Sequence, residues 1–444
     1  MERSNAVRLT WLNREIEDGR ACAARCLGAL VLFVCLLNSA MGLANAAPGT
    51  QVGVSTASSV LSGTAIDAGN VKSFASLVPS ALAFAIAHGL TVHVVPTTRV
   101  PWPQGYQAAT EHYSAQVRLD SYDAMQNYVA GLPFPLIDWK DPKAAVKIAY
   151  NWHWGPFIPS QVNLLATQKT RAWTIDPSHP GLLFEDDAHR DFRNEGSCDQ
   201  IVIVRYMHTV RELADSHHRD SPVEFKQRGD YCGPEPNAYI MIQYLDPARS
   251  SDAWFFPSAV RRWRRMKWKG GYPHQSCTYA CASFWWEYVP PKTEAYTYKL
   301  IGEQPLLGCL DAKGTGAGIQ HNQNATRFGR VDCEVRSAYV LEMTPRDAPE
   351  NILPAKLFLD KETYLFLGAE FYRGAVPDAL APLWRRQSLG PDETQMVLTD
   401  DFYVPADRSL FFLSLNMDEE PNVLDADPPS DNLFNYRDQG HEPH

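Results

Sequence analysis

Alternation of apolar and polar residues predicts several strands in the second half of this 444-residue chain. Within residues 238–245, every second residue from Ile240 to Tyr244 would share one face of a strand. Residues 357–359 and 364–367 flank a short polar stretch, a spacing that is typical of a hairpin. Further strands are expected at residues 200–206, 296–302, 336–343 and 410–415. Their spacing and their β-branched and aromatic content favour antiparallel sheet throughout.

Two segments follow the helical period instead. Residues 74–88 are apolar and rich in alanine. The second helix would begin after residue 140, because Asp141 can cap its first turn and Pro142 fits a position where no amide hydrogen is needed. Its apolar face is formed by residues at the spacing i, i+3, i+4 and i+7, namely Ala145, Ile148, Ala149 and Trp152. A large antiparallel sheet with few helices implies an α+β fold in which the helices cover one face of the sheet.

The two ends of the chain differ in composition from its middle. Residues 1–46 combine arginines, an apolar run at residues 27–37 and the small residues Ala44 and Ala46, which is the pattern of a secretory signal peptide. The apolar run is shorter than the roughly 20 residues that span a bilayer, and a buried core helix is the alternative. The remainder is predicted to consist of a flexible lead-in at residues 47–70, a single domain at residues 71–418 and a poorly ordered acidic tail at residues 419–444.

The charge of the chain disfavours one class of partner. The whole chain has a formal net charge of −10, and removal of residues 1–46 would leave 36 basic and 47 acidic side chains. Such an acidic chain does not fit a nucleic-acid-binding protein, whose affinity depends on neutralising phosphates. We therefore expect no nucleic-acid partner. No stretch after residue 46 is long and apolar enough to be predicted as a membrane span.

Six of the nine cysteines would remain after cleavage of the signal peptide. They are Cys198, Cys232, Cys277, Cys281, Cys309 and Cys333. An even number of cysteines in an exported protein favours disulfides, and six cysteines allow fifteen pairings between which a sequence cannot choose. The alternative is a metal site built from His274, Cys277 and Cys281, although export favours the disulfides.

Known catalytic motifs are missing from the sequence, which contains no zinc-protease motif, no phosphate-binding Walker loop and no nucleophile elbow. The glycine-rich residues 314–318 follow no predicted strand and precede no predicted helix, so a flexible loop is favoured over a phosphate-binding loop. His217 and His218 lie among charged residues, which favours a solvated turn over a metal site. We therefore predict no catalytic residue, no metal and no cofactor.

Two features favour a binding site. Residues 261–269 carry six basic side chains in nine positions, which either form a solvated face over apolar neighbours or hold an anionic head group. Aromatic residues gather at residues 152–157, 254–256 and 284–288. Most of them should be core, but aromatic side chains also line pockets for apolar ligands. Pro133 and Pro135 stiffen the stretch before the second helix and would lower the entropy lost on folding.

Short stretches spread over roughly residues 75–415 resemble a bacterial family of unknown function, number thirteen twenty-nine, whose members are often labelled outer-membrane lipoprotein-sorting-like proteins. The stretches are residues 95–99 with Pro103 and Tyr106, then 131–135, 150–153, 260–265, 298–302, 339–342, 358–360, 371–372 and 383–385. The resemblance implies residence in the periplasm or at the outer membrane. It also implies a curved antiparallel half-barrel, similar to lipoprotein carriers, whose apolar concave side is closed by helices. An inner-membrane export pump or an outer-membrane protein is the implied partner, and no catalytic residues are established for the family.

Together these features predict a carrier or chaperone for a hydrophobic molecule, such as a lipid, an acyl chain or a sterol-like ligand. We expect the protein's own side chains to leave the apolar inner side of the sheet partly open. The expected ligand-binding residues are Phe134, Trp152, His153, Trp154, Arg261, Arg262, Arg264, Arg265 and Tyr298. Two alternatives remain: a secreted hydrolase that uses His153 or His208 with a nearby carboxylate, and a structural protein of the outer membrane.

Overall fold

The computed structural model describes only part of the chain, and every structural statement below refers to that part. The described residues are 61–157, 161–165, 171–175, 182–185, 200–205, 223–231, 237–244, 249–257, 260–267, 292–311, 319–322, 325–346, 354–372, 377–390, 393–404, 411–414, 431–435 and 437. The chain divides into Met1–Gln51 and Val52–His444. The predicted signal peptide at residues 1–46 lies outside the described residues, as do His208, residues 217–218 and residues 314–318.

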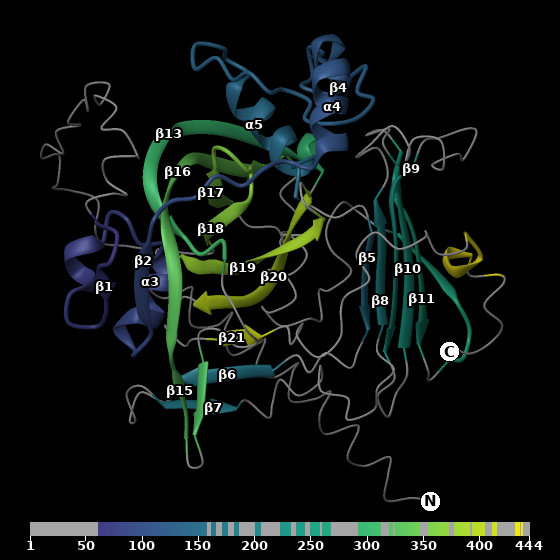
Figure 1. Ribbon diagram of the computed structural model, residues 1–444. Coiled ribbons are helices and arrows are strands. Elements are labelled where there is room, and N and C mark those ends of the chain that lie inside the picture. The colour runs from purple at the N-terminus through teal and green to yellow at the C-terminus, as the bar shows by residue number, and fades with distance from the viewer. Residues whose placement is uncertain are drawn as a thin grey trace, which may run out of the picture. The chain divides into compact units, whose positions relative to one another are not determined.

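Strands dominate the described part, and a few short helices accompany them (Figure 1). The α-helices are α3 (Ser80–Ala87), α4 (Gln104–Tyr113) and α5 (Ala144–His153), and the 3-10 helices are η1 (Val71–Phe74), η2 (Ser114–Gln116), η4 (Thr293–Ala295) and η5 (Asp431–Phe434). The predicted mixture of a large sheet with few helices is therefore confirmed. The first predicted helix, residues 74–88, is shorter than expected, and α4 was not predicted because its sequence has no continuous apolar stripe.

Among the described residues, the larger sheet contains thirteen strands. They are β1 (Ala65–Ile66), β2 (Thr91–Val95), β6 (Arg171–Ile175), β7 (Leu182–Glu185), β13 (Tyr296–Gly308), β14 (Ile319–Asn322), β15 (Ala325–Phe328), β16 (Arg330–Pro345), β17 (Ala355–Asp360), β18 (Phe366–Phe371), β19 (Asp378–Gly390), β20 (Glu393–Val404) and β21 (Phe411–Ser414). Its hydrogen-bonded order is β1-β2-β16-β17-β18-β19-β20-β21-β6-β7-β15-β14, with β13 on the second edge of β16.

A second described sheet contains six strands in the order β12-β11-β10-β9-β8-β5. They are β5 (Gln161–Leu165), β8 (Gln200–Arg205), β9 (Val223–Tyr231), β10 (Asn237–Tyr244), β11 (Asp252–Pro257) and β12 (Arg264–Lys267). Two short strands, β3 (Arg118–Leu119) and β4 (Met125–Gln126), form a separate pair. The strands predicted at residues 200–206, 238–245, 296–302, 336–343 and 410–415 all correspond to observed strands, as does the hairpin of β17 and β18.

One strand pairing departs from the prediction of antiparallel sheet throughout. The central strand β16 is antiparallel to β13 along one edge, but on its other edge it is parallel to β2 and then antiparallel to β17. The parallel register joins Val331 to Val92 and Cys333 to Val94. Alternation of apolar residues is the same for both strand directions, so the sequence pattern could not reveal that β2 runs parallel.

The larger sheet bends strongly at its centre, as the curved ribbons of β13 and β16 show (Figure 1). Directly after β13, Cys309 forms a parallel bridge with Leu383 of β19, and its carbonyl oxygen accepts a hydrogen bond from the Trp384 backbone N–H at 2.9 Å. Since β16, β17 and β18 lie between β13 and β19 in the sheet order, the sheet must curve for these two strands to meet. A disulfide joins Cys309 to Cys333 of β16 at this place, which confirms the expectation of disulfides.

Two apolar cores lie on opposite faces of β19. Ala381 belongs to a core with Leu82 of α3, which packs on β19 and β20, whereas Leu380 belongs to a core with Ile148 of α5. Neighbouring residues of a strand point to opposite faces, so the helices lie on both faces of the sheet. The prediction that they cover a single face is therefore wrong. The apolar stripe of a helix requires a partner surface but does not say which face of the sheet provides it.

Parts of the predicted lead-in and tail are folded. Ile66 of β1 pairs with Val92 of β2 and is fully buried, so residues 61–70 of the lead-in belong to the packed structure. At the other end, η5 lies in the region expected to be an acidic tail, and Phe434 is buried in a core. Isolated apolar residues such as these carry no periodic signal, which is why the composition of both segments favoured disorder.

Strands β2 and β17 pair with two successive stretches of the same edge of β16. A buried ionic network lies between these two stretches. The guanidinium of Arg336 makes two hydrogen bonds to Asp360, of 2.7 and 3.0 Å, one of 2.8 Å to Glu362 and one of 2.9 Å to the Thr98 carbonyl oxygen. Glu334 lies 3.5 Å from the same guanidinium and accepts the Thr98 backbone N–H at 2.6 Å. The side chains of Arg336 and Asp360 are 2% and 1% exposed. The network therefore ties β16 and β17 to the segment that follows β2.

Glu334 is the buried carboxylate that extends this network to a further strand. Burial raises its pKa, although Arg386 and Arg336 and the Thr98 backbone N–H act in the opposite direction. Arg386 of β19 donates a hydrogen bond of 2.5 Å to Glu334, so the network also reaches across the bend of the sheet. Removing one partner of such a buried ion pair lowers the free energy of unfolding strongly, because the remaining charge stays desolvated. This loss is larger than the stability that the intact pair adds relative to an apolar replacement of both residues.

Replacing Arg336 by methionine should lower the free energy of unfolding by about 3 to 5 kcal/mol, because Asp360 and Glu334 would keep buried charges without their partner. Arg330→Met on the same strand is the matched control: the Arg330–Asp332 pair is 58% and 47% exposed, and its loss should cost at most about 1 kcal/mol. Urea unfolding followed by circular dichroism measures both. Equal losses in the two variants would contradict a special role for the buried network.

Removing the Cys309–Cys333 disulfide should also destabilise the protein. The bond closes a loop with a sequence separation of 24, for which loop-closure entropy predicts a loss of about 3 kcal/mol. The double variant Cys309→Ala/Cys333→Ala, unfolded in urea beside the parent protein, tests this. An unchanged transition midpoint would show that the pairing of β13 with β16 alone holds this part of the sheet.

Candidate functional site

Helix α5 and the segment before it cover the apolar side of the larger sheet. The helix begins at Ala144, two residues after the predicted first position. Asp141 still organises the start, because its carboxylate accepts the Lys143 backbone N–H at 2.8 Å and pairs with Lys147 at 2.5 Å. The hydrogen bond from Lys147 is the main reason that the pKa of Asp141 lies below its usual value. We call α5 together with residues 131–137 the cover.

Residues 131–137 are held against α4 and α5 by specific backbone contacts. Gly131 adopts a left-handed conformation with φ of 77° and lies against the backbone of Thr110. The Thr110 hydroxyl oxygen accepts the Leu132 N–H at 2.8 Å. The fully buried Asn151 pairs with Phe134 as a strand would, accepting its N–H at 2.9 Å and donating to its carbonyl oxygen at 2.6 Å. The stiff proline-containing stretch therefore runs along α5 as an added layer.

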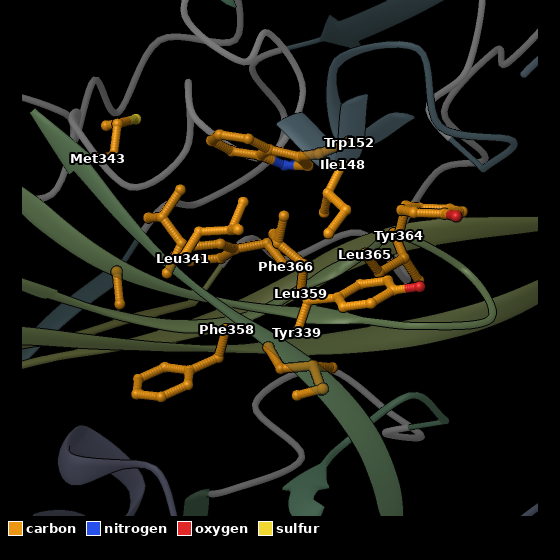
Figure 2. Close-up of a cluster of buried hydrophobic side chains, with 14 of the residues drawn as sticks. Ile148, Trp152, Tyr339, Leu341, Met343, Phe358, Leu359, Tyr364, Leu365 and Phe366 are labelled. Atoms are coloured by element: carbon orange, nitrogen blue, oxygen red, sulfur yellow. The ribbon is translucent and has the colours of Figure 1, made fainter. Parts of the chain in front are cut away.

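The two sides of α5 enter two different cores. Ile148 and Trp152 belong to what we call the Trp152 cluster, and Figure 2 shows both side chains above the strands of the sheet. The sheet residues of this cluster include Tyr339, Leu341, Met343, Leu357, Leu359, Leu365, Phe366 and Leu380. Trp152 stacks on Phe366 with ring centroids 6.2 Å apart. Phe358 points to the other side of the sheet from Trp152 (Figure 2).

The other side of α5 enters a core that we call the Tyr150 cluster. It contains Val146 and Tyr150 of α5, Trp154 directly after α5, Phe134, and residues of the six-stranded sheet and the C-terminal segment, namely Val223, Ile240, Ile242, Tyr244 and Phe434. The ring of Trp154 lies 4.9 Å from that of Tyr128, and its carbonyl oxygen accepts the Tyr106 hydroxyl at 2.5 Å. One helix thus joins the apolar cores of the two sheets.

A small polar group lies at the sheet-facing end of the Tyr150 cluster. The Tyr150 hydroxyl lies 2.8 Å from a carboxylate oxygen of Glu294 and accepts the Met125 backbone N–H at 3.1 Å. Burial raises the pKa of Tyr150 well above its usual value, and the charge of Glu294 adds to the effect. The phenol therefore stays neutral and acts as a hydrogen-bonding anchor, not as a base.

The structure brings five of the predicted binding residues together around α5. Phe134, Trp152, His153 and Trp154 are all buried, and the ring of His153 lies 5.0 Å from that of Trp154. Tyr298 of β13 packs against both clusters, and burial raises its pKa well above the usual value. Whether these residues hold a ligand stays a prediction. They are positioned as a connected group, but as part of the packed core.

The four predicted arginines lie elsewhere, at the last described strand of the six-stranded sheet. Arg261 and Arg262 precede β12, and Arg264 and Arg265 begin it. Arg261 has a positive φ of 49°, which is the reason that the strand does not start there. All four side chains are exposed, and Arg265 pairs with Asp252 of β11. These arginines form a charged surface and do not line the interior around His153.

The expected partly open apolar side is not found among the described residues. Trp152, Leu341, Leu357, Leu359 and Phe366 are all buried under the cover. By contrast, Leu136 of the cover is 88% exposed, and Trp139, just outside it, is 47% exposed. In the part of the chain that the structure describes, the cover therefore closes off this apolar surface.

The sequence patterns did not indicate several residues that hold the cover in place. Asn151 and Thr110 are polar residues inside helices, and their role depends on a backbone that arrives from a distant part of the chain. The only local signal was the pair of prolines beside Gly131. In the described part of the chain, no three His, Cys, Asp or Glu side chains are arranged to hold a metal ion. The alternative metal ligands His274, Cys277 and Cys281 lie outside the described residues.

Comparison with protein families gives one assignment. The model of the family described as "Protein of unknown function (DUF1329)" matches residues 65–399. This range contains all the stretches that carried the resemblance in the sequence, from residues 95–99 to residues 383–385. The family resemblance is therefore confirmed. A comparison with curated proteins gives no match.

Solved structures with a similar arrangement include three of low sequence identity. A DUF1329 family protein from Desulfovibrio piger is 12% identical, with 66% of this chain and 96% of that chain covered and a TM-score of 0.38. A putative outer membrane lipoprotein-sorting protein domain from Vibrio parahaemolyticus has the same identity and coverage and a TM-score of 0.36. A LolA superfamily protein from Nitrosomonas europaea is 15% identical, with 61% and 90% covered and a TM-score of 0.28.

The described part of the chain contains no helix with the length and hydropathy that crossing a membrane requires.

Replacing Gly131 by alanine should lower the free energy of unfolding by about 2 kcal/mol or more. A Cβ atom there would lie 2.7 Å from the Thr110 hydroxyl oxygen and closer still to its backbone nitrogen, and the positive φ adds strain. The matched control is Gly105→Ala in α4, where nothing lies within 4 Å of the new Cβ, so stability should stay the same or rise by up to about 1 kcal/mol. Thermal and urea unfolding of both variants decide whether the close approach at Gly131 holds the cover.

Proposed function

Because the chain belongs to the DUF1329 family, which is described only as proteins of unknown function, we propose from its geometry that it is a non-enzymatic carrier of a hydrophobic molecule. The ligand would be a lipid, an acyl chain or a sterol-like molecule. It would lie on the apolar side of the larger sheet, between the strands and the cover. We place the protein in the periplasm or at the periphery of the outer membrane, with residues 1–46 as its signal peptide and an export pump or an outer-membrane protein as its partner.

One observation carries the proposal: a broad aliphatic sheet surface is covered mainly by a single ten-residue helix and the segment before it. On the sheet side, Leu341, Leu357 and Leu359 lie in neighbouring positions of β16 and β17, next to Ala369 of β18. Rows of aliphatic side chains suit an acyl chain, since each buried methylene contributes about 0.8 kcal/mol. About ten methylenes would supply roughly 8 kcal/mol before the costs of binding and of moving the cover.

The bend of the sheet supports the same proposal. The contact between Cys309 and Leu383 requires the part of the sheet formed by β13, β16, β17, β18 and β19 to be curved. A curved sheet of this kind, with a helix over its inner side, fits the half-barrel that the sequence resemblance implies. On this proposal the inner side is the ligand site and α5 with residues 131–137 is its closed cover.

The attachment of the cover explains how it would open. Residues 131–137 are joined to α5 by the two hydrogen bonds of Asn151 and to α4 by the hydrogen bond of Thr110. The exposed side chains of Leu136, in the cover, and Trp139, beside it, offer an apolar surface that an arriving ligand would meet first. Because Trp152 fills the space over Phe366 when the cover is closed, ligand entry and displacement of Trp152 would occur together. Tryptophan fluorescence would therefore report binding.

The hydrolase alternative has less support. The ring of His153 is buried beside Trp154, so a substrate would reach it only through the same movement of the cover, and His208 lies outside the described residues. We therefore keep the carrier as the proposed function.

Mass spectrometry of gently purified protein should detect a retained hydrophobic molecule, and delipidated protein should change its tryptophan fluorescence on titration with a long-chain fatty acid. Thr110→Val should accelerate ligand exchange several-fold, because the hydrogen bond of about 1 kcal/mol that joins Leu132 of the cover to α4 would be lost. Gln107→Ala, on the exposed side of α4, is the control and should exchange ligand as the parent does. A folded, delipidated protein whose fluorescence ignores every long-chain ligand would rule the carrier out.

A further inference from the structure

The loop between β17 and β18 contains a residue in an unfavourable backbone conformation. Tyr364 has a positive φ of 56°. This left-handed conformation suits glycine and is tolerated by asparagine and aspartate, whereas a bulky residue brings its Cβ atom close to a carbonyl oxygen. A residue stays in such a conformation only where its surroundings fix it. The contacts of Tyr364 should therefore explain why a tyrosine stands where a glycine would cause less strain.

The loop is held in one conformation by Asp360. Its carboxylate accepts the backbone N–H groups of Glu362 at 3.1 Å and of Thr363 at 2.7 Å. The Asp360 carbonyl oxygen accepts the Tyr364 N–H at 2.9 Å. The same carboxylate accepts two hydrogen bonds from Arg336 of β16. The backbone of Tyr364 therefore belongs to a loop that is fixed to the centre of the larger sheet.

The side chain of Tyr364 is buried in the Trp152 cluster and reaches the cover. Its ring stacks on that of Tyr339, with centroids 6.2 Å apart (Figure 2). Its hydroxyl oxygen accepts hydrogen bonds from Asn151 of α5 and from Tyr339. Burial raises the pKa of Tyr364 to about 12, so the hydroxyl stays protonated at neutral pH. Tyr364 thereby joins the larger sheet to α5 through a polar contact inside an apolar cluster.

The hydrogen-bonding groups of Asn151 are all used by this arrangement. Its side-chain oxygen accepts the Phe134 N–H at 2.9 Å, and its amide nitrogen donates to the Phe134 carbonyl oxygen at 2.6 Å. The amide nitrogen carries two hydrogens, so the second one serves the Tyr364 hydroxyl. Because Asn151 is fully buried, losing a partner would leave a polar group without compensation. A chain of hydrogen bonds therefore runs from the loop through α5 to residues 131–137.

The loop also contacts the chain next to α4 and α5. The indole N–H of Trp102, which precedes α4, donates a hydrogen bond of 3.1 Å to the Glu362 carbonyl oxygen. Gly155 follows α5, and a Cβ atom added there would lie 3.8 Å from the Thr363 carbonyl oxygen. The end of α5 therefore lies close to the loop that carries Tyr364, as the hydrogen bond to Asn151 requires.

We propose that Tyr364 is a positioning residue that latches the cover onto the larger sheet. The loop between β17 and β18 is the fixed side of this latch and imposes the left-handed backbone that brings the ring of Tyr364 beside α5. Asn151 is the movable side, so the cover opens only when its amide leaves the Tyr364 hydroxyl. The effect of the latch on ligand exchange rests on the proposed carrier function, whereas the attachment itself can be measured without a ligand.

Amide hydrogen exchange of the full-length protein, measured without ligand, tests the latch. Tyr364→Phe keeps the ring but removes the hydroxyl, so the buried Asn151 amide loses an acceptor. Exchange of the Phe134 N–H, which is bonded to Asn151, should accelerate roughly tenfold. Exchange in β16 and β17 should change much less, because the hydrogen bonds of the sheet ladder do not depend on this hydroxyl.

Tyr339→Phe is the matched control, since it removes the other hydroxyl of the same stacked pair. The hydrogen bond between Asn151 and Tyr364 stays in place, so exchange of the Phe134 N–H should remain close to that of the parent protein. Equal exchange of the Phe134 N–H in the two variants would overturn the latch. An acceleration in Tyr364→Phe that is equally large in β16 and β17 would overturn it as well, because it would report a general loss of stability.

A dansyl-labelled long-chain fatty acid connects the latch to ligand exchange. Its release should be several-fold faster from Tyr364→Phe than from Tyr339→Phe, because the first variant alone frees Asn151 from the sheet. Equal release from both variants would contradict a role of the latch in ligand exchange. A parent protein that does not bind the probe would contradict the carrier, and the exchange of the Phe134 N–H would still decide the latch.

Discussion

The pairing of β16 with strands on both of its edges is the constraint on which the rest of the larger sheet depends. β13 follows one edge for nearly its whole length, whereas the other edge is shared between β2 and β17. Between the stretches of β16 that pair with β2 and β17, no ladder hydrogen bonds join these strands. There the Arg336 network and hydrogen bonds from Thr97 and Lys361 to backbone carbonyl oxygens of β16 take their place. A sheet that splits inside the protein needs such polar groups, because unpaired backbone atoms away from water are costly.

The same strand determines where the cover can lie. Its residues Tyr339, Leu341 and Met343 face the Trp152 cluster, and the bend that follows brings β13 to β19. An apolar surface of this size must be covered, and a single helix covers it here with the help of residues 131–137. Helix α5 also supplies Tyr150 to the core of the six-stranded sheet, and Trp154 directly after the helix belongs to the same core. A movement of this helix would therefore change the packing of both cores.

The chemistry of the proposed ligand surface follows from its neighbours. The surface below Trp152 is aliphatic and aromatic, with Leu357 and Leu359 of β17 beneath the helix, and would suit the uncharged part of a ligand. The exposed arginines before and in β12 are numerous in the sequence, yet they lie on a charged surface and not at this site.

The sequence by itself determined the strands with clear alternation, such as β10 and β13, the hairpin of β17 and β18, and the helix that carries Ile148 and Trp152, because burial of one face imposes a period on the residues. It also determined the family, through short stretches such as residues 131–135. Only the tertiary structure decided that β2 runs parallel to β16, that α3 and α5 lie on opposite faces, that Cys309 pairs with Cys333, and that Phe434 covers Lys226. These features join residues that are far apart in the chain, and the local pattern of apolar residues is the same whichever distant partner each surface meets.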